Sequence, residues 1–275
     1  MRNMLKDLHN KYHYSFVVLR ELVKTDFKLR YQGSFLGIAW SVVKPLMLFA
    51  VMYTVFVRFL KFTDGTPTFP VVLLLGNCLW SFFVESTGIG LRSIVDRGDL
   101  LRKIHFPNYI VVVSATIGAL ISLLINFVVV FIFCLFSPVT FTWRVLLTPI
   151  FVLELVMLSV GVSLILAALY VYFRDIAHIW EVIMQVLFYA TPIIYPLSMV
   201  DRYSHTITKL MLMSPIAQVF QDIRHNFISP QYVPTVWTEI GNKGIAAIPM
   251  ILSVAIFVFG IYIFKKNSQK FAEVL

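Results

Sequence analysis

The run 109–136 reads YIVVVSATIGALISLLINFVVVFIFCLF, and it decides the fold class. It contains no Asp, Glu, Lys or Arg, and it is longer than the about 20 apolar residues that a helix needs to cross the hydrocarbon core of a bilayer. Only a helix satisfies its own backbone hydrogen bonds along such a segment in lipid. The run therefore predicts a transmembrane helix.

Apolar runs of similar length occur elsewhere in the chain, near 37–60, 69–91, 145–172, 178–197 and 246–264. The 275 residues are 59% hydrophobic and 13% charged, and the mean hydropathy is +0.83. A soluble domain carries about 25% charged residues. We predict an all-α integral membrane protein of one domain, 1–275, with six transmembrane helices. Pro192 and Pro196 interrupt the end of the fifth.

Lys and Arg are distributed unevenly between the two sides of this arrangement. Fifteen of the 23 lie at 1–31, 92–103, 174 and 265–270, whereas seven lie on the opposite side. The richer side usually faces the cytoplasm, so both termini are predicted to be cytoplasmic, as an even number of spans also requires. The net charge of +9 then indicates topology and contact with anionic membrane lipid, not nucleic-acid binding.

The first of three segments that do not span is 14–31. Apolar residues recur there at helical spacing: Phe16, Leu19, Val23 and Phe27. Basic residues recur every four positions on another face: Arg20, Lys24 and Lys28. This pattern predicts an amphipathic helix lying in the membrane interface. The alternative is an ordinary topology signal that happens to be helical.

The second segment is the loop 93–107, SIVDRGDLLRKIHFP. Its charges surround an apolar stripe of Ile94, Leu100, Leu101 and Ile104. An apolar stripe on a charged cytoplasmic segment favours docking to a partner. The alternative is a solvated or lipid-lying loop.

The third segment is the outer loop 198–245, with a helical stretch near 206–227 that is too polar to span. Its prolines indicate short helices and turns. Such a segment can re-enter the outer leaflet or cap a pathway; an outer loop without function is equally compatible with the sequence.

Most enzyme and cofactor chemistry has no motif in this chain. There is no G-x-x-x-x-G-K-[ST] loop for ATP phosphates and no G-x-S-x-G nucleophile elbow. His9 and His13 lie four residues apart, which alone is weak evidence for a metal. Cys78 and Cys134 lie in apolar runs and are predicted to be buried thiols. We therefore predict no catalytic residues, cofactor or metal.

Ionisable side chains within spans are costly, so the three carboxylates Glu85, Glu154 and Glu181 are functional candidates. An ion pair near Arg92 or Arg174 is at least as compatible as a proton relay. Pro45, next to Lys44, predicts a break or kink in the first span. Aromatic residues are abundant, and Phe49, Tyr53 and Phe56 fall on one helical face. They are interpreted as lipid anchors or as flat apolar faces along an internal pathway.

The run 22–46, LVKTDFKLRYQGSFLGIAWSVVKPL, closely resembles the start of ABC-2-type permeases that export polysaccharides such as O-antigen, teichoic acid or rhamnose polysaccharide. The matching residues, in order, are Arg30, Gly33, Ser34, Leu36, Gly37, Trp40 and Pro45. Further matches are the loop near 100–107, the Tyr-Phe-Arg-Asp turn at 172–175 and Thr-Pro-Ile-Ile-Tyr at 191–195. The resemblance covers nearly the whole chain and is specific as an ensemble.

The resemblance implies the ABC-2 (type V) exporter fold, with short gating helices in the outer loop, 198–245. It implies a homodimer, paired with two copies of a separate ATPase, in the bacterial cytoplasmic membrane. The implied substrate is a lipid-linked glycan on an undecaprenyl-diphosphate carrier. The resemblance also fits the absence of the G-x-x-x-x-G-K-[ST] loop (the Walker A loop), because in this family a separate chain hydrolyses the ATP.

The resemblance also suggests roles for individual residues. The basic candidates for the diphosphate head group are Arg20, Lys24, Lys28 and Arg30. The candidates for coupling to the ATPase are Asp99, Leu100, Leu101, Arg102, Arg174 and Asp175. The candidates for the glycan pathway are Phe49, Tyr53, Phe56 and Tyr195.

Three alternative functions stay open from the sequence. An ABC-2 permease for a small hydrophobic drug or lipid would share the same frame. An ion-driven carrier would need more membrane carboxylates. A membrane enzyme acting on lipid-linked sugars would need clustered interfacial acids or histidines.

Overall fold

The computed structural model describes residues 2–31, 34, 36–62, 65–104, 106–228 and 230–271, with side chains from residue 14 onward except 30, 31 and 38. Every regular element in these ranges is a helix. The all-α prediction is thus confirmed for the part of the chain that the structure describes.

Five helices are long and apolar enough to cross a membrane: Trp40–Phe59, Phe69–Asp96, Tyr109–Leu135, Trp143–Tyr172 and Lys243–Ser268. They contain α2 (Trp40–Met52), α3 (Phe69–Asp96), α5 (Tyr109–Leu135), α6 (Thr148–Tyr172) and α13 (Ile248–Ser268). α2 continues through a π-helical segment, Tyr53–Phe59. Each coincides with one of the predicted runs.

The remaining predicted span, 178–197, is represented by α7 (Ile176–Ala190), which has 15 residues. At 1.5 Å per residue such a helix is about 22 Å long, shorter than a hydrocarbon core of about 30 Å. The chain leaves the helix at Thr191, directly before Pro192. The prediction of six spans therefore stays a prediction.

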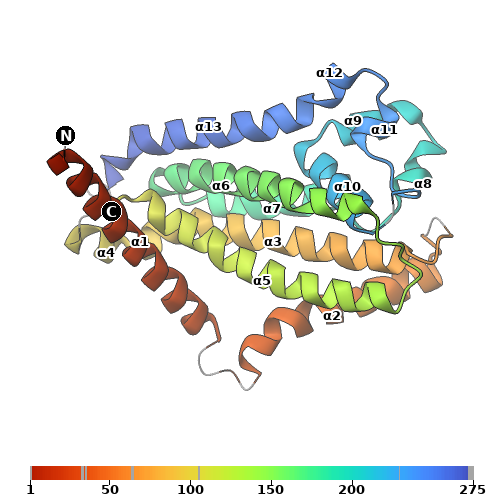
Figure 1. Cartoon of the computed structure of the whole chain (residues 1–275), viewed down its shortest axis with the longest axis horizontal. Helices are drawn as coiled ribbons and strands as arrows, with labels where there is room; N and C mark the ends of the chain where they lie inside the picture. The colour runs from red at the N-terminus through yellow and green to blue at the C-terminus, as the bar shows by residue number, and fades with distance from the viewer. Residues whose placement is uncertain are drawn as a thin grey trace.

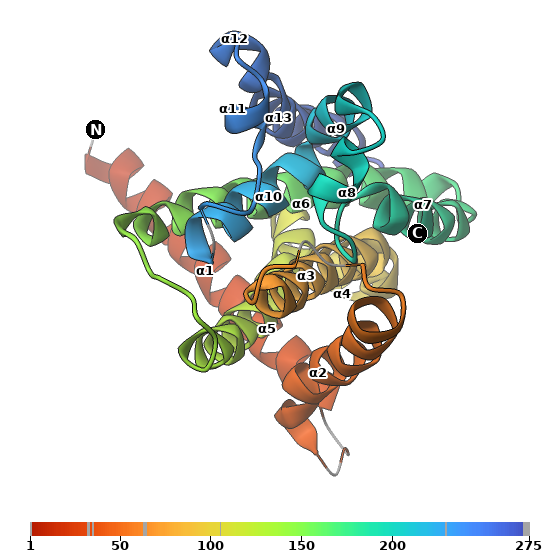
Figure 2. The same cartoon turned by 90° about the vertical axis from the view of Figure 1, so that its right-hand side faces the viewer.

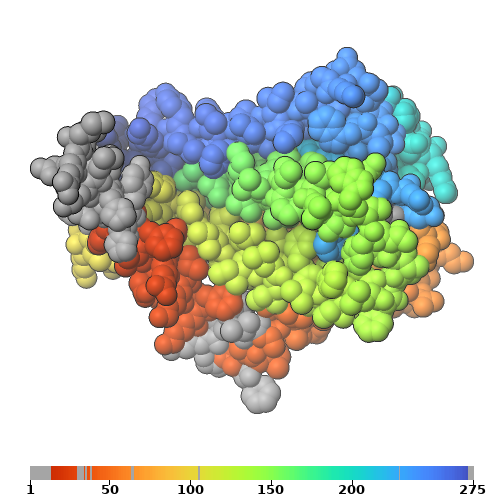
Figure 3. Space-filling view, viewed as in Figure 1, coloured from red at the N-terminus to blue at the C-terminus, as the bar shows by residue number. Residues whose placement is uncertain are grey.

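The long helices run side by side along the longest axis of the molecule (Figure 1). α1 (Arg2–Tyr31) lies obliquely across one end, beside α4 (Gly98–Lys103), and both chain termini lie at that end. We call it the terminal end. In the space-filling view α5, α6 and α13 form one broad face, and the coloured part of α1 lies beside α5 at the terminal end (Figure 3).

The short helices gather at the opposite end, which we call the distal end (Figure 2). They are α8 (Leu197–Asp201), α9 (His205–Leu212), α10 (Pro215–Phe227), α11 (Val236–Glu239) and α12 (Lys243–Ala246). The outer loop thus forms the short helices and turns that its prolines indicate.

α3 is the central helix, and most of its apolar residues are buried. Small residues let its neighbours approach closely. A Cβ at Gly90 would lie 2.7 Å from Cβ of Ser163 on α6, and one at Gly260 on α13 would lie 2.4 Å from the carbonyl oxygen of Gly161 on α6. The packing of α3, α6 and α13 therefore depends on these glycines. Cys78 and Cys134 are buried free thiols, as predicted.

α2 continues as a helix through Pro45, so of the predicted break or kink the break is wrong, whereas the kink stays a prediction. Proline has no N–H to donate to the carbonyl four residues earlier, which belongs to Ser41. Asn126 on α5 donates its side-chain amide to that carbonyl at 3.2 Å. A tertiary contact thus supplies the donor that the proline lacks, and the helix continues.

Candidate functional site

The amphipathic segment α1 packs on the terminal end of the bundle. Val18, Leu19 and Leu22 contact a buried cluster that includes Ile94 and Val111. Phe16 is 64% exposed, so the apolar face that packs is rotated from the one predicted from spacing alone. α1 is helical as predicted; its place in a membrane interface stays a prediction.

Arg97 fastens α1 to the bundle. Its guanidinium forms an ion pair with Asp26 on α1 and donates to the hydroxyl of Ser114 on α5 at 3.2 Å. Both charged side chains are about one-fifth exposed. Because the pair is largely shielded from water, removal of one partner would leave the other charge partly buried and unpaired, which is costly. The sequence did not single out these residues, since they are separated by about 70 positions.

The basic residues of α1 lie on its outer side. Arg20, Lys24 and Lys28 are exposed, as is the neighbouring Leu29, whereas the side chain of Arg30 lies outside the described residues. The structure thus brings three of the four predicted head-group residues together on one exposed surface.

The predicted docking loop forms α4 at the same end. Asp99, Arg102 and Lys103 are exposed, and Ile104 is 41% exposed. Leu100 and Leu101, in contrast, are half-buried against the cluster that also holds α1. The surface that α4 offers to a partner is therefore mainly charged, and its two leucines anchor it to the bundle.

The turn between α6 and α7 adds a second exposed, charged surface. Arg174 and Asp175 are exposed, and the guanidinium of Arg174 lies 5.1 Å from the ring centre of Tyr170. On α7, Glu181 accepts a hydrogen bond from Arg92 of α3 at 3.2 Å. Of the two alternatives for Glu181, an ion pair or a proton relay, the structure thus shows the ion pair, with Arg92.

A groove of about 550 Å³ runs between α2, α3, α5 and α7. Its lining combines aromatic residues with one basic and one acidic side chain: Trp40, Trp80, Phe188, Lys44 and Glu85. The rings of Trp80 and Phe188 lie 5.6 Å apart. We call this space the aromatic groove.

A second groove of about 490 Å³ lies between α3 and α7 and shares Trp80, Val84 and Phe188 with the first. Trp180 and Tyr189 extend its lining. The indole N–H of Trp180 donates to the hydroxyl of Thr87 at 3.2 Å, which fixes the ring. The two grooves therefore adjoin along the Trp80–Phe188 pair.

The four predicted pathway residues do not line either groove. Phe49 packs edge-on against Phe133 of α5, with ring centres 5.9 Å apart, and Tyr53 lies beneath Arg58. Phe56 packs on Phe62. The Tyr195 hydroxyl donates to the carbonyl of Tyr189 at 2.8 Å. Of the aromatic lining residues, Trp40 was named from the sequence, as part of the family motif, whereas Trp80 and Phe188 were not singled out.

At the distal end, α10 is buried from Ile216 to Asn226 although half its residues are polar. The guanidinium of Arg224 donates to the carbonyls of Pro192 at 2.5 Å and Ile193 at 3.0 Å, and packs against Gly76 of α3. Arg224 thus joins α10 to the proline-containing turn after α7. Burial lowers the pKa of Arg224 to about 9.

Asp222 is the centre of a second buried cluster on α10. Its carboxylate accepts from the amide of Gln218 at 2.6 Å and from the indole of Trp237 at 3.2 Å. Gln218 also lies 3.4 Å from the carboxylate of Glu154 on α6. Burial raises the pKa of Asp222 to about 7, against the effect of its hydrogen bonds. Glu154, a candidate from the sequence, therefore belongs to this distal cluster.

Asp201, His205 and Glu239 form a three-residue cluster of the kind that can hold a metal ion, with ligand atoms within 4.8 Å of one another. His205 contacts Asp201 at 2.6 Å and lowers its pKa. This cluster was not predicted, because its members come from three different helices. Asp201 and His205 are exposed, so solvation alone accounts for the arrangement.

Comparison with known proteins places these features in a family. The family described as ABC-2 type transporter matches residues 18–228, which run from α1 to the end of α10. The chain is 29% identical over 275 residues to the O-antigen export system permease protein RfbA of Myxococcus xanthus, covering 98% of this chain and 99% of the relative. It is 28% identical over 265 residues to a protein of the same name from Klebsiella pneumoniae, covering 95% and 96%.

Proposed function

Because the chain belongs to the ABC-2 type transporter family, we propose that it is the permease subunit of a polysaccharide exporter in the bacterial cytoplasmic membrane. The substrate is a glycan on a lipid diphosphate carrier, and a separate ATPase supplies the energy. The nearly end-to-end similarity to two O-antigen export permeases supports this assignment. The observation that carries it is the aromatic groove.

The aromatic groove fits a sugar chain better than a purely apolar cargo. Trp40, Trp80 and Phe188 present flat faces, while Lys44 and Glu85 add polar groups. Binding sites of this kind are mainly apolar, with a few placed polar groups that orient the ligand. The grooves follow α2, α3 and α7, and each is open on one side in a single chain. A second copy of the chain supplies the facing wall, so the exporter is a homodimer.

The terminal end faces the cytoplasm in this proposal, because the positive-inside rule places its Lys and Arg there. Both termini lie at this end in Figure 1, which supports the proposed even number of crossings. α7 supplies the sixth crossing of the membrane. Its helix is short, and residues 191–196 continue the crossing through the outer leaflet.

The exposed basic residues of α1 receive the diphosphate of the carrier. Arg20, Lys24 and Lys28, with Arg30, provide the charge-assisted donors that a diphosphate requires. Reversing all four charges is expected to abolish export while the protein still inserts into the membrane. Lys243→Glu, at the distal end, serves as the control. Export at the wild-type rate in the fourfold variant would remove this role.

Two ATPase subunits dock on the terminal end. The exposed residues Asp99, Arg102 and Lys103 of α4 and the 174–175 turn form the contact surface, and the half-buried Leu100 and Leu101 transmit movement into the bundle. Closure of the ATPase dimer then parts the two permeases along their shared groove.

The central experiment is purification of the chain with its ATPase, followed by measurement of ATP turnover with and without lipid-linked glycans. The proposal expects a stable complex whose turnover rises when the correct glycan is added. Transport by the purified chain without an ATPase would contradict it, and stimulation by a small hydrophobic drug alone would assign a different cargo.

A further inference from the structure

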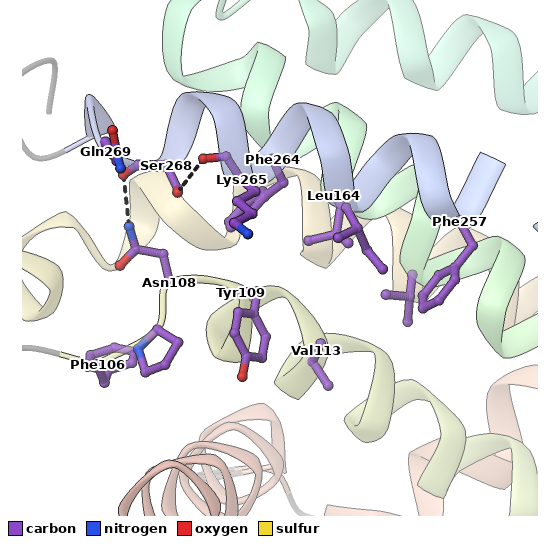
Figure 4. A pocket seen from close by; sticks show the side chains of 13 residues that line it. Phe106, Asn108, Tyr109, Val113, Leu164, Phe257, Phe264, Lys265, Ser268 and Gln269 are labelled. Atoms are coloured by element: carbon purple, nitrogen blue, oxygen red, sulfur yellow. Dashed lines mark hydrogen bonds between the residues drawn. The ribbon is translucent and has the colours of Figure 1, made fainter. Parts of the chain in front are cut away.

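A cavity larger than the aromatic groove lies on another side of the molecule. It has a volume of about 730 Å³ and is formed by the beginning of α5, the middle of α6 and the second half of α13 (Figure 4). Ligand-binding cavities in proteins commonly measure about 300–1,000 Å³. We call it the lateral groove.

Tight packing between α6 and α13 determines where the groove opens. The two helices touch at Gly161 and Gly260, where neither position has room for a Cβ. α5 packs on α3 and α6, and its first turn reaches α13 through the Asn108 side chain, which donates to the Ser268 carbonyl at 3.1 Å. The lateral groove is the space between α5 and α13, and the hydrogen bond between Asn108 and Ser268 lies at its terminal end.

The two parts of the groove differ in chemistry. Toward the middle of the bundle its walls are apolar, with Val113, Leu164 and Phe257. Toward the terminal end it is polar, and the Lys265 side chain extends from α13 toward the beginning of α5 (Figure 4). Lys266 is equally exposed but does not line the groove.

We propose that the lateral groove binds one anionic phospholipid, with an acyl chain in the apolar part and the phosphate at the Lys265 ammonium group. All three helices belong to membrane spans, so the groove opens into the bilayer, where acyl chains surround it. Basic pockets between transmembrane helices at one membrane surface are suited to anionic head groups. The order of the lining, from apolar to cationic toward the membrane surface, matches that of the lipid.

The bound lipid bridges α13 to α5 at the terminal end. These two helices otherwise meet there through the Asn108–Ser268 hydrogen bond and through Phe106 and Phe264, which belong to one buried hydrophobic cluster. Filling the groove therefore stabilises the position of α13, as binding to the native state alone always stabilises it.

Native mass spectrometry of the purified full-length chain tests the head-group contact. Protein in detergent is titrated with phosphatidylglycerol or phosphatidylcholine. The wild type is expected to retain phosphatidylglycerol preferentially, and Lys265→Gln to bind it about fivefold more weakly, as removal of one lysine near a membrane surface implies. Lys266→Gln is the matched control and should keep wild-type binding. Equal losses in the two variants would indicate general surface attraction and overturn the proposal.

A second pair of variants tests the acyl-chain part. Ile261→Trp places a large ring at the mouth of the groove, whereas Val258→Trp, one turn away on α13, adds the same ring on a surface that does not line it. Phosphatidylglycerol binding should fall in the first variant and persist in the second. Both variants are compared at equal monodispersity, so that a folding defect is recognised. Unchanged binding in Ile261→Trp would show that the lipid lies elsewhere.

Discussion

The side-chain amide of Asn126 on α5 donates to the backbone carbonyl of Ser41 on α2 at 3.2 Å, replacing the helical donor that Pro45 cannot provide. One helix thus completes the hydrogen bonding of another. Asn77 on α3 makes a similar contact with the carbonyl of Pro45 at 3.3 Å. Together they hold α2 against the bundle and set which of its residues face the aromatic groove.

Asn126→Ala should destabilise the protein by about 1–3 kcal/mol, because a buried carbonyl loses a donor. Combining it with Pro45→Ala should recover part of this loss, since the alanine N–H can again serve Ser41. Thermal denaturation in detergent of the wild type, the two single variants and the double variant gives the coupling free energy between Asn126 and Pro45. Asn77→Ala serves as the control, because Pro45→Ala does not replace its donor. Strictly additive effects of Asn126→Ala and Pro45→Ala would refute the relationship.

Asp26→Asn should loosen α1 from the bundle. The ion pair with Arg97 is largely shielded, so its loss costs about 1.5 kcal/mol or more. We expect the amide protons of 18–29 to exchange about tenfold faster in hydrogen-exchange mass spectrometry. Glu21→Gln, an exposed change on the same helix, should leave exchange unaltered. Restored protection in the double variant Asp26→Arg with Arg97→Asp would strengthen the assignment, whereas unchanged exchange in Asp26→Asn would contradict it.

The combined variant Asp99→Lys with Arg102→Glu should uncouple the ATPase without unfolding the permease, because both side chains are exposed. Reversed charges at a complementary surface cost several kcal/mol, so the affinity for the ATPase should fall by about a hundredfold or more, and little ATPase should co-purify. Leu100→Asp is a different change: it places a charge in a half-buried position and should lower the melting temperature itself. Wild-type recovery of ATPase with the double variant would show that α4 is not the docking surface.

Trp40→Ala and Phe188→Ala should each slow glycan export by about threefold or more, since each removes one flat face from the aromatic groove. The triple truncation of Tyr53, Phe56 and Tyr195 should have a smaller effect on passage, because these rings pack outside both grooves. Export is measured against basal ATP turnover, which should persist. Phe59→Ala, an exposed position on the same span as Trp40, is the control. The opposite ranking would restore the pathway predicted from spacing.

The stability of the distal end should decrease as pH rises from about 4 to about 7 and should level off above that range. Burial raises the pKa of Asp222 from 3.8 to about 7, so the folded state holds a proton that the unfolded state has already released between these values. Linkage then makes folding less favourable with rising pH over this range. Asp222→Asn keeps an acceptor for Gln218 and Trp237 and should flatten the dependence of melting temperature between about pH 4 and pH 7. Equal slopes in both proteins would place the titrating group elsewhere.

The sequence by itself determined the helical fold class and located the five helices that are long and apolar enough to cross a membrane. A run such as 109–136 is apolar along its whole length, and its cost of exposure to water is a local property that no partner changes. The uneven distribution of Lys and Arg between the two sides can likewise be read from the sequence without knowing which helices pack together. The prolines after residue 190 marked the end of α7, although how they shorten it became clear only in three dimensions.

The tertiary structure decided which side of each helix faces what. A helix that is apolar all round carries no signal for its rotation, and so Tyr53 and Phe56 could not be separated from Trp40 and Phe188 as groove residues. The same holds for α1, whose packed face is rotated from the predicted one, and for Leu100 and Leu101, which anchor α4. Rotation is set by contacts between residues far apart in the chain, such as Asn126 with Ser41 and Arg97 with Asp26, and these exist only once the helices have packed.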